Sequence, residues 1–543
     1  MDFKRNPSIS FGGFLFCRKD AGVKRRRYQG SGLVQITVIL AVLLALLVGE
    51  SATELPVWLN GFEGLNCLAM MAGSILLLWA FSRISAKMLL GRLERAGQSV
   101  RSVLRLPGKI DIMMQVMILS LFAVQLTIGG WGRLVCVRWQ LGKLILIDEL
   151  LIIAPFIAML VIKWYFFYPV NRFIKEYIIA GQLAGGISTR PVWSRRQYIS
   201  FNIRHHILII LGPLFLILTY KDIVELVARY LIGGGVGNAE FSPETDLAVQ
   251  AIVVAGGGAI FICAPILLRR IWLTRSLPEG PLRRRLEGFC RGMGFKYRDI
   301  LLWETYSAVS NAAVMGLVWP LRYVLLSDAL IENMPDEQIE AVFGHEAGHV
   351  KHHHIMLLMF FIMGSGSLLV LLLELLTWVI TRISGQGSWQ QWVVYGGVPI
   401  AGFVWFMLFG WVSRRFERQA DVYGAWAAGK AGEENNSQAE NVDNADNKET
   451  GECGAGRRIL NSRGVAIMIA ALGRIALLNG IPVETRSWRH SSIASRMDLL
   501  AQLFERKDKL KQFERGIRFI QVFSVIMPMI AMLGWWWLSD RQH

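Results

Sequence analysis

The sequence predicts a mainly α, polytopic membrane protein with about nine transmembrane helices and one further domain outside the bilayer. Its 543 residues are 53% hydrophobic and only 18% charged, and the mean hydropathy is +0.40. Several apolar runs approach or exceed the roughly 20 residues that a helix needs to cross a hydrocarbon core of about 30 Å. Because a soluble core seldom needs even one such run, the composition excludes an ordinary soluble domain.

The formal net charge of +17 indicates membrane topology and not nucleic-acid binding. Lys and Arg lie mainly in the segments between apolar runs, as is typical of cytoplasmic loops. We therefore expect a lipid bilayer and no nucleic acid as partner. The six cysteines form no C-x-x-C pair, which argues against a disulfide framework and against a thiolate zinc site.

Nine apolar segments are the candidate membrane spans. Orientation by positive charge places the basic connections 83–109, 171–204 and 269–351 on the cytoplasmic side, together with the N-terminal tail. The fifth segment is the shortest. The nine segments are residues 33–49, 65–81, 112–128, 150–168, 207–220, 247–268, 355–380, 392–412 and 519–538.

These spans divide the chain into membrane regions and two stretches long enough to fold outside the bilayer. Residues 269–354 and 413–516 are both predicted on the cytoplasmic side, where we expect them to associate into one domain. Residues 430–456 are acidic, amide-rich and poor in large apolar side chains, so a disordered surface insertion is predicted there. The other regions are a basic cytoplasmic tail (1–32), a six-helix membrane region (33–268), two helices (355–412) and a final helix (517–543).

The pattern His345-Glu346-Ala347-Gly348-His349 lies in a predicted helix that starts near Pro335. Residues four apart share a helix face, so both imidazoles can point at one zinc ion while Glu346 faces a water bound to it. Neutral imidazole nitrogen is a good zinc ligand, and three protein ligands leave a fourth position open. The alternative is a polar helix end at the membrane surface whose histidines cap carbonyl groups.

A second polar cluster, SRRFERQAD at 413–421, follows the eighth apolar segment on the same predicted face of the membrane. Glu417 and Asp421 are four residues apart, so one can complete the zinc ligands while the other accepts the free N–H of a zinc-bound imidazole. The alternative is a solvated helix end in which Glu417 pairs with neighbouring Arg. The shared membrane face favours the metal site.

Together these segments resemble the integral-membrane zinc peptidases that include the heat-shock protease HtpX and the type I CAAX prenyl protease. The resemblance covers about residues 277–500 and rests on four stretches in the family's order. They are LPEGPLRRRLEGFCRGMGFK, SNAAVMG, LLSDALIENMPDEQIEAVFGHEAGHVKHHH and SRRFERQAD. It implies a gluzincin-type α+β metallopeptidase domain that binds one Zn²⁺ per chain.

The resemblance also implies a role for each residue of the two motifs. His345, His349 and Glu417 would be the zinc ligands, Glu346 the general base, and Asp421 the hydrogen-bond partner of a ligand. The expected activity is zinc-dependent hydrolysis of peptide bonds.

Further elements follow from the same resemblance. Residues 311–316 and 323–327 look like strands, and an edge strand would pair with an extended peptide, which makes Asn311 and Ala312 candidate substrate contacts. His490 and Arg496 occupy the family's His-Pro segment and the Arg after it, and would stabilise the oxyanion. Ser491 stands where proline is usual, so an ordinary basic helix start is the alternative for these two.

The substrate expected from this placement is a membrane or membrane-proximal protein, hydrolysed in quality control at the bacterial inner membrane, with the active site cytoplasmic. Processing of prenylated proteins is one alternative. A transporter or scaffold with a vestigial zinc site is another, because the first six apolar segments match nothing in the resemblance. The histidines at 352–354 are expected to provide surface polarity.

Overall fold

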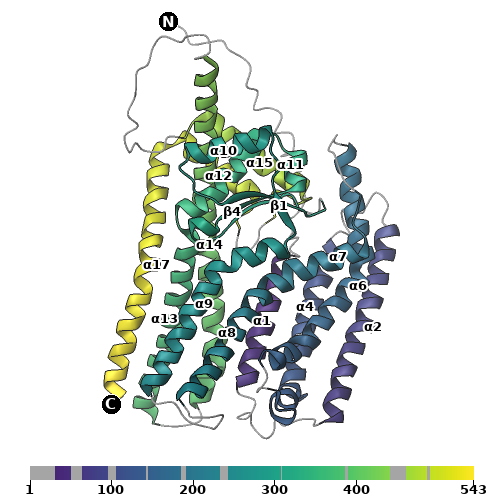
Figure 1. Ribbon diagram of the computed structural model, residues 1–543, viewed down its shortest axis with the longest axis vertical. Helices are drawn as coiled ribbons and strands as arrows, with labels where there is room; N and C mark the ends of the chain where they lie inside the picture. The colour runs from purple at the N-terminus through teal and green to yellow at the C-terminus, as the bar shows by residue number, and fades with distance from the viewer. Residues whose placement is uncertain are drawn as a thin grey trace.

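The computed structural model in Figure 1 shows long helices that run side by side, with short helices and a small sheet gathered at one end. The structure describes residues 31–50, 64–95, 105–141, 145–184, 191–232, 243–306, 309–385, 389–440, 460–485 and 490–542. The small-sheet end lies at the top of the view, and the last described residues of the chain lie at the bottom.

The front half of the chain forms a helical bundle at the right of Figure 1. Its core contains apolar side chains from α1, α2, α4 and α6, including Leu78, Phe122 and Phe156, which are almost fully buried. The helices are α1 (Ser31–Glu50), α2 (Leu65–Arg95), α4 (Arg105–Leu126), α5 (Trp131–Arg133), η5 (Leu134–Arg138) and α6 (Ile147–Ala184).

Two further helical stretches lead from this bundle to the sheet. The first is continuous and consists of α7 (Arg195–Asn202), the π-helical segment η7 (Ile203–Leu208) and α8 (Ile209–Ile232). The second, α9 (Pro243–Ile271), packs against α8 and ends just before the first strand.

The second group of long helices contains α13 (His354–Ser384), α14 (Trp389–Glu440) and α17 (Lys507–Gln542). α13 packs against both α14 and α17. α14 extends beyond this group and runs beside α12 at the top of Figure 1.

The domain at the top contains a four-stranded sheet of order β1-β2-β4-β3. β1 (Thr274–Ser276) is antiparallel to β2 (Asp299–Trp303), β2 is parallel to β4 (Tyr323–Ser327), and β3 (Ala312–Met315) is antiparallel to β4. Among the strands that the structure describes, β3 pairs only with β4, so it is an edge strand. The short helices here are α10 (Pro281–Gly292), η8 (Trp319–Leu321), α11 (Asp328–Asn333), α12 (Asp336–Lys351), α15 (Ser462–Leu478) and α16 (Ile493–Glu505).

The predicted fold class is confirmed: a mainly α polytopic membrane protein that carries a small α+β domain. Eight of the nine predicted apolar segments lie within helical stretches, and the third, 112–128, extends two residues beyond the end of α4 at Leu126 into a turn. Among the described residues, seven helical stretches are long and apolar enough to cross a membrane, and α1 contributes a shorter apolar stretch, Val34–Leu46. The short fifth segment belongs to one of the seven, because helix extends on both sides of it, from Arg195 to Leu231.

One local difference concerns the predicted disordered insertion. The structure continues α14 as helix through residues 430–440, whereas residues 441–459 lie outside the described part of the chain. Glu, Ala, Lys and Gln are strong helix formers, so a helix that is already nucleated can extend through such a sequence without burying it.

An aromatic stack joins the front half to the sheet. His205 of η7 stacks between Phe201 and Trp272, and its ring also lies 5.4 Å from that of Trp303 on β2. The indole Nε1 of Trp303 donates to Nε2 of His205 over 3.2 Å. The front half is therefore fixed to the domain that carries the HExxH motif.

Candidate active site

Two helices approach unusually closely where the predicted site residues lie. α12 carries His345, Glu346 and His349, and α14 packs directly against it. A Cβ on Gly424 of α14 would lie 2.9 Å from the backbone nitrogen of His345 and 2.9 Å from the carbonyl oxygen of Ala341. Only glycine allows this separation, so the Gly424 backbone sets the distance between the two motifs.

α12 is also held from its other side. Arg285 of α10 donates to both carboxylate oxygens of Glu340, with distances of 2.6 and 3.1 Å. Glu340 is buried, so this bidentate pair fixes the helix in register with α10.

The structure brings the side chains of His345, His349 and Glu417 together. The two Nε2 atoms of the histidines are 3.3 Å apart. Oε2 of Glu417 lies 3.7 Å from Nε2 of His345, and Oε1 lies 3.8 Å from Nε2 of His349. The two segments that the sequence places at one membrane face therefore converge in a single cluster.

The spacing of these three donor atoms fits a tetrahedral metal ion. Ligand atoms about 2.0–2.1 Å from a tetrahedral zinc ion are roughly 3.3 Å from one another. The 3.3 Å between the two Nε2 atoms matches that value, and each Nε2 lies 3.7 or 3.8 Å from a different oxygen of Glu417, with one donor atom of each residue within 4.8 Å of the other two. Two imidazole nitrogens and a carboxylate oxygen are also the donor types that zinc accepts.

His345 is oriented by a buried ion pair behind it. Its Nδ1 lies 2.9 Å from Oδ1 of Asp421, and Asp421 accepts two hydrogen bonds from the guanidinium of Arg496 on α16. The side chains of Asp421 and Arg496 are 2% and 12% exposed, so this pair is shielded from water. With Nδ1 directed at a carboxylate, the lone pair of Nε2 faces the cluster.

The charges around this pair keep both carboxyl groups ionised. Burial alone would raise the pKa of Asp421, but the neighbouring Arg496 lowers it below its ordinary value. Burial likewise opposes ionisation of Glu417, yet the hydrogen bond from His490 and the nearby imidazoles hold its pKa well below the usual range. Both groups are therefore anionic at neutral pH.

Glu346 has a different environment from the other carboxylates. Burial raises its pKa to about 7, and the neighbouring Glu417 charge adds to this effect, whereas His345 opposes it. The backbone of Val314 on β3 also opposes the rise of this pKa, as the smallest of the contributions. A carboxyl group whose pKa lies near 7 can exchange a proton at working pH.

The hydrogen bonds between β3 and β4 show which backbone groups of β3 point away from β4. Asn311 exchanges two hydrogen bonds with Ser327, because its carbonyl accepts from the Ser327 N–H and its N–H donates to the Ser327 hydroxyl. Direction alternates along a strand, so the backbone groups of Ala312 and Val314 point away from β4. The Ala312 side chain is only 2% exposed, so only its backbone can meet a peptide.

Comparison with known proteins agrees with this geometry. Residues 276–461 match Peptidase family M48. Protease HtpX of Xylella fastidiosa (strain M23) is 32% identical over 203 residues, which cover 34% of this chain and 68% of that protein. The chain belongs to peptidase family M48.

A second relative supports the same assignment. Protease HtpX of Xanthomonas axonopodis pv. citri (strain 306) is 28% identical over 216 residues, 36% of this chain and 70% of that protein. The crystal structure of S. mikatae Ste24p aligns with 81% of this chain at 15% identity and a TM-score of 0.43, a similarity too low for inferences about fold or substrate. M48 peptidases are zinc-dependent, and this chain is accordingly a membrane metalloprotease.

One residue that contacts His349 was not identified from the sequence. His354, which was expected to provide surface polarity, is 1% exposed, and its Nδ1 lies 2.9 Å from Nδ1 of His349. Its ring stacks on Phe416 with centroids 4.5 Å apart. The chain turns at His353, whose φ of +53° breaks the path between α12 and α13. That break brings the ring of His354 back to His349.

The hydrogen bonds of His354 determine the tautomer of His349. Nε2 of His354 lies 2.9 Å from Oε1 of Gln419, an oxygen that also accepts from Gln521 Nε2. Nε2 of His354 must therefore be the donor, and in a neutral ring its Nδ1 is then the acceptor. His349 donates from Nδ1 and keeps the lone pair of Nε2 for the cluster.

The two predicted oxyanion groups lie at the site but contact other side chains. Nδ1 of His490 is 3.1 Å from Oε2 of Glu417, and its side chain is 47% exposed. Arg496 is held by Asp421. The structure thus places both residues behind or beside the three donors, and their role toward an oxyanion stays a prediction.

Proposed function

We propose that this chain is a zinc endopeptidase that hydrolyses membrane-embedded or membrane-proximal proteins, with His345, His349 and Glu417 as the zinc ligands. The observation that carries the proposal is the cluster of donor atoms: the two Nε2 atoms are 3.3 Å apart, each lies within 3.8 Å of one Glu417 carboxylate oxygen, and one atom from each residue lies within 4.8 Å of the other two. It leaves room for a fourth ligand, as catalytic zinc sites require. When bound there, zinc would lower the pKa of a water molecule to about 7 and polarise a peptide carbonyl.

Glu346 is the proton carrier in this proposal. Its carboxylate takes the proton of the attacking water and delivers it to the nitrogen of the leaving amine. A pKa near 7 suits both steps, because the group is neither a very weak base nor a very weak acid at neutral pH. Bound zinc adds positive charge near the carboxylate and favours its ionised, proton-accepting form.

The substrate would lie along β3 as an added strand. The outward backbone groups of Ala312 and Val314 can pair with an extended peptide, which sets its carbonyl beside α12. Asn311 contributes its exposed side chain, since its backbone groups bond to Ser327. Because the Val314 backbone influences the pKa of Glu346, the proton carrier lies beside the peptide platform.

The two histidine ligands would be oriented from behind by Asp421 and by His354. Asp421, itself fixed by Arg496, holds the Nδ1–H of His345. His354 accepts the Nδ1–H of His349. Each contact keeps Nε2 deprotonated and aimed at the cluster, which raises metal affinity.

The membrane placement of the site supports the substrate class. α14 carries Glu417 about one helical turn beyond the predicted end of the eighth span, so the ligands lie close to a membrane surface. Positive-inside orientation puts that surface in the cytoplasm, and the matched HtpX proteases are bacterial. We infer a role in quality control at the inner membrane, with unfolded segments of membrane proteins as substrates.

Glu346→Gln tests this function most directly. Purified full-length protein is compared with the variant for bound zinc by elemental analysis and for casein cleavage. We expect about one zinc per chain in both proteins, and cleavage reduced by at least about 100-fold in the variant. Glu337→Gln, an exposed acid on the same helix that pairs with Arg463, is the matched control and should keep full activity.

The same assay separates the alternatives. Equal cleavage by wild type and Glu346→Gln would show that Glu346 takes no part in the mechanism. A wild-type protein that binds no zinc would favour the non-catalytic scaffold. Cleavage of a prenylated peptide with no cleavage of casein would favour prenyl-protein processing. The three expected zinc ligands and the base Glu346 are all present in the chain, which favours the endopeptidase.

A further inference from the structure

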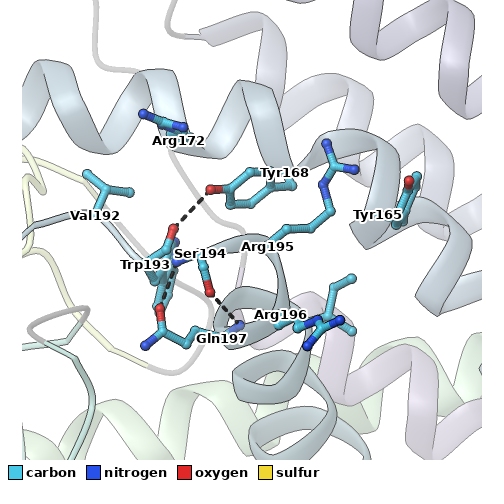
Figure 2. Close-up of a pocket in the computed structure, with 10 residues that line it drawn as sticks. Tyr165, Tyr168, Arg172, Val192, Trp193, Ser194, Arg195, Arg196 and Gln197 are labelled. Atoms are coloured by element: carbon cyan, nitrogen blue, oxygen red, sulfur yellow. Dashed lines mark hydrogen bonds between the residues drawn. The ribbon is translucent and has the colours of Figure 1, made fainter.

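A basic pocket lies in the front half, where α6 meets the start of α7. Figure 2 shows Tyr168 of α6 pointing at Trp193 in the segment that begins α7, with the Arg195 side chain between Tyr168 and Tyr165. The pocket has a volume of about 700 Å³ and is open to the surface. Ten residues line it: Tyr165, Tyr168, Arg172, Val192, Trp193, Ser194, Arg195, Arg196, Gln197 and Ile199.

The pocket carries three arginines and no acidic lining residue among those that the structure describes. The guanidinium carbon of Arg195 lies 4.5 Å from the ring centroid of Tyr165 and 5.3 Å from that of Tyr168. Arg172 pairs with Glu176 outside the pocket lining, and both side chains are about half exposed. Such an exposed pair is weak, so Arg172 remains available to an anion.

The wall of the pocket is fixed before any ligand arrives. The Tyr168 hydroxyl donates to the carbonyl of Trp193 over 3.0 Å and ties the segment before α7 to α6. Ser194 forms a capping box with Gln197, in which each side chain accepts from the other residue's backbone N–H. Figure 2 shows these bonds beside Arg195. A preformed site binds without the cost of ordering its loop.

The pocket lies at the level of a membrane surface. Tyr165 and Tyr168 are the last residues of the predicted apolar segment 150–168, and Arg172 follows one turn later on the same helix face. Aromatic rings are typical of the membrane–water boundary, where one side meets lipid and the other meets water. An occupant of this pocket can thus have an apolar part in the bilayer and an anionic part at the arginines.

We propose that this pocket binds the phosphate headgroup of an anionic glycerophospholipid. Arg195, which lies against both tyrosine rings, contacts the phosphate oxygens with geometry that guanidinium groups favour, and Arg172 and Arg196 add charge at the rim. The rings of Tyr165 and Tyr168 hold the Arg195 guanidinium in place and contact the glycerol and first acyl carbons. The site gives the front half a function that is independent of peptide hydrolysis.

The test measures lipid retention by the full-length protein in neutral detergent micelles, which present no anionic surface. Native mass spectrometry follows the binding of phosphatidylglycerol and phosphatidylcholine, with glycerol 3-phosphate as a soluble competitor. Arg195→Gln with Arg196→Gln removes two of the three positive charges that line the pocket. Arg515→Gln with Arg518→Gln is the matched control, because these exposed arginines lie just before the predicted apolar segment of α17, outside the pocket.

We expect the wild type to prefer phosphatidylglycerol and the pocket variant to bind it about 10- to 25-fold more weakly, whereas the control pair changes little. Equal losses in both pairs would overturn the site in favour of general surface charge. Displacement of the lipid by millimolar glycerol 3-phosphate would overturn it in favour of a soluble phosphate. Tyr165→Leu keeps every charge and should still weaken binding, so the proposal stays testable if the double variant misfolds.

Discussion

The two histidines of α12 are oriented by different chemistry, although they lie one helical turn apart. Behind His345 stands a buried ion pair, Asp421 with Arg496. Behind His349 stands a hydrogen-bond chain of neutral groups, His354 followed by Gln419. The first arrangement connects α12 to α14 and α16, and the second connects it to the start of α13 and to α14.

This difference predicts unequal sensitivity to mutation. A buried charge that loses its partner stays desolvated without compensation, which costs several kcal/mol. A neutral chain that loses one member leaves at most an unpaired polar group, which costs less. The His345 side should therefore govern stability, and the His349 side should mainly govern metal affinity.

The largest effect is expected when the ion pair is broken from one side. Arg496→Met leaves Asp421 buried and unpaired, so the free energy of unfolding should fall by about 3–5 kcal/mol. Zinc affinity should fall by about 10- to 100-fold, because His345 loses its fixed orientation. Chemical unfolding and chelator competition measure the two quantities.

Two variants act as controls for this prediction. Arg463→Met breaks an exposed pair with Glu337 and should cost less than about 1 kcal/mol. Adding Asp421→Asn to Arg496→Met removes the stranded charge and should recover part of the stability. If Arg496→Met proved no more harmful than Arg463→Met, the ion pair would not be what holds His345.

A change at the contact between α12 and α14 should destabilise the protein less and should displace both histidines equally. Gly424→Ala puts a Cβ 2.9 Å from the backbone of α12 and forces the helices apart, at a cost of about 1–3 kcal/mol. Because the three donors come from these helices, zinc affinity should fall by about tenfold or more. Gly402→Ala on the same helix, where nothing lies within 4 Å of the new Cβ, should leave both quantities unchanged.

The fold could be predicted largely because hydropathy accumulates over some 20 residues. Eight of the nine apolar segments lie within helical stretches and the third passes the end of α4 by two residues, and the strands expected at 311–316 and 323–327 are present as β3 and β4. The extent of helix around the fifth segment could not be predicted in this way. Polar residues such as Arg195 and Arg204 continue that helix outside the apolar run, and hydropathy does not register them.

The site could be predicted where residues are linked by helical periodicity or by motif. His345, Glu346 and His349 follow from their spacing, and Glu417 from its motif and membrane face. The partners behind them are set by tertiary structure. On one continuous helix His354 would lie about 140° around from His349, and the turn at His353 alone brings the two rings together.

Mutations in the hydrogen-bond chain of His354 and Gln419 behind His349 should have the smallest effect on stability and should mainly lower zinc affinity. His354→Phe keeps the stack on Phe416 but removes the acceptor for the Nδ1–H of His349, so zinc affinity should fall by about tenfold with little loss of stability. His354→Asn places an amide oxygen near the former Nδ1 position and should restore part of the affinity. Gln419→Leu acts one step further away and should weaken zinc binding less than His354→Phe does. Chelator competition on the folded variants measures this order, and a stability loss in His354→Phe as large as that of Arg496→Met would show that the two supports do not differ.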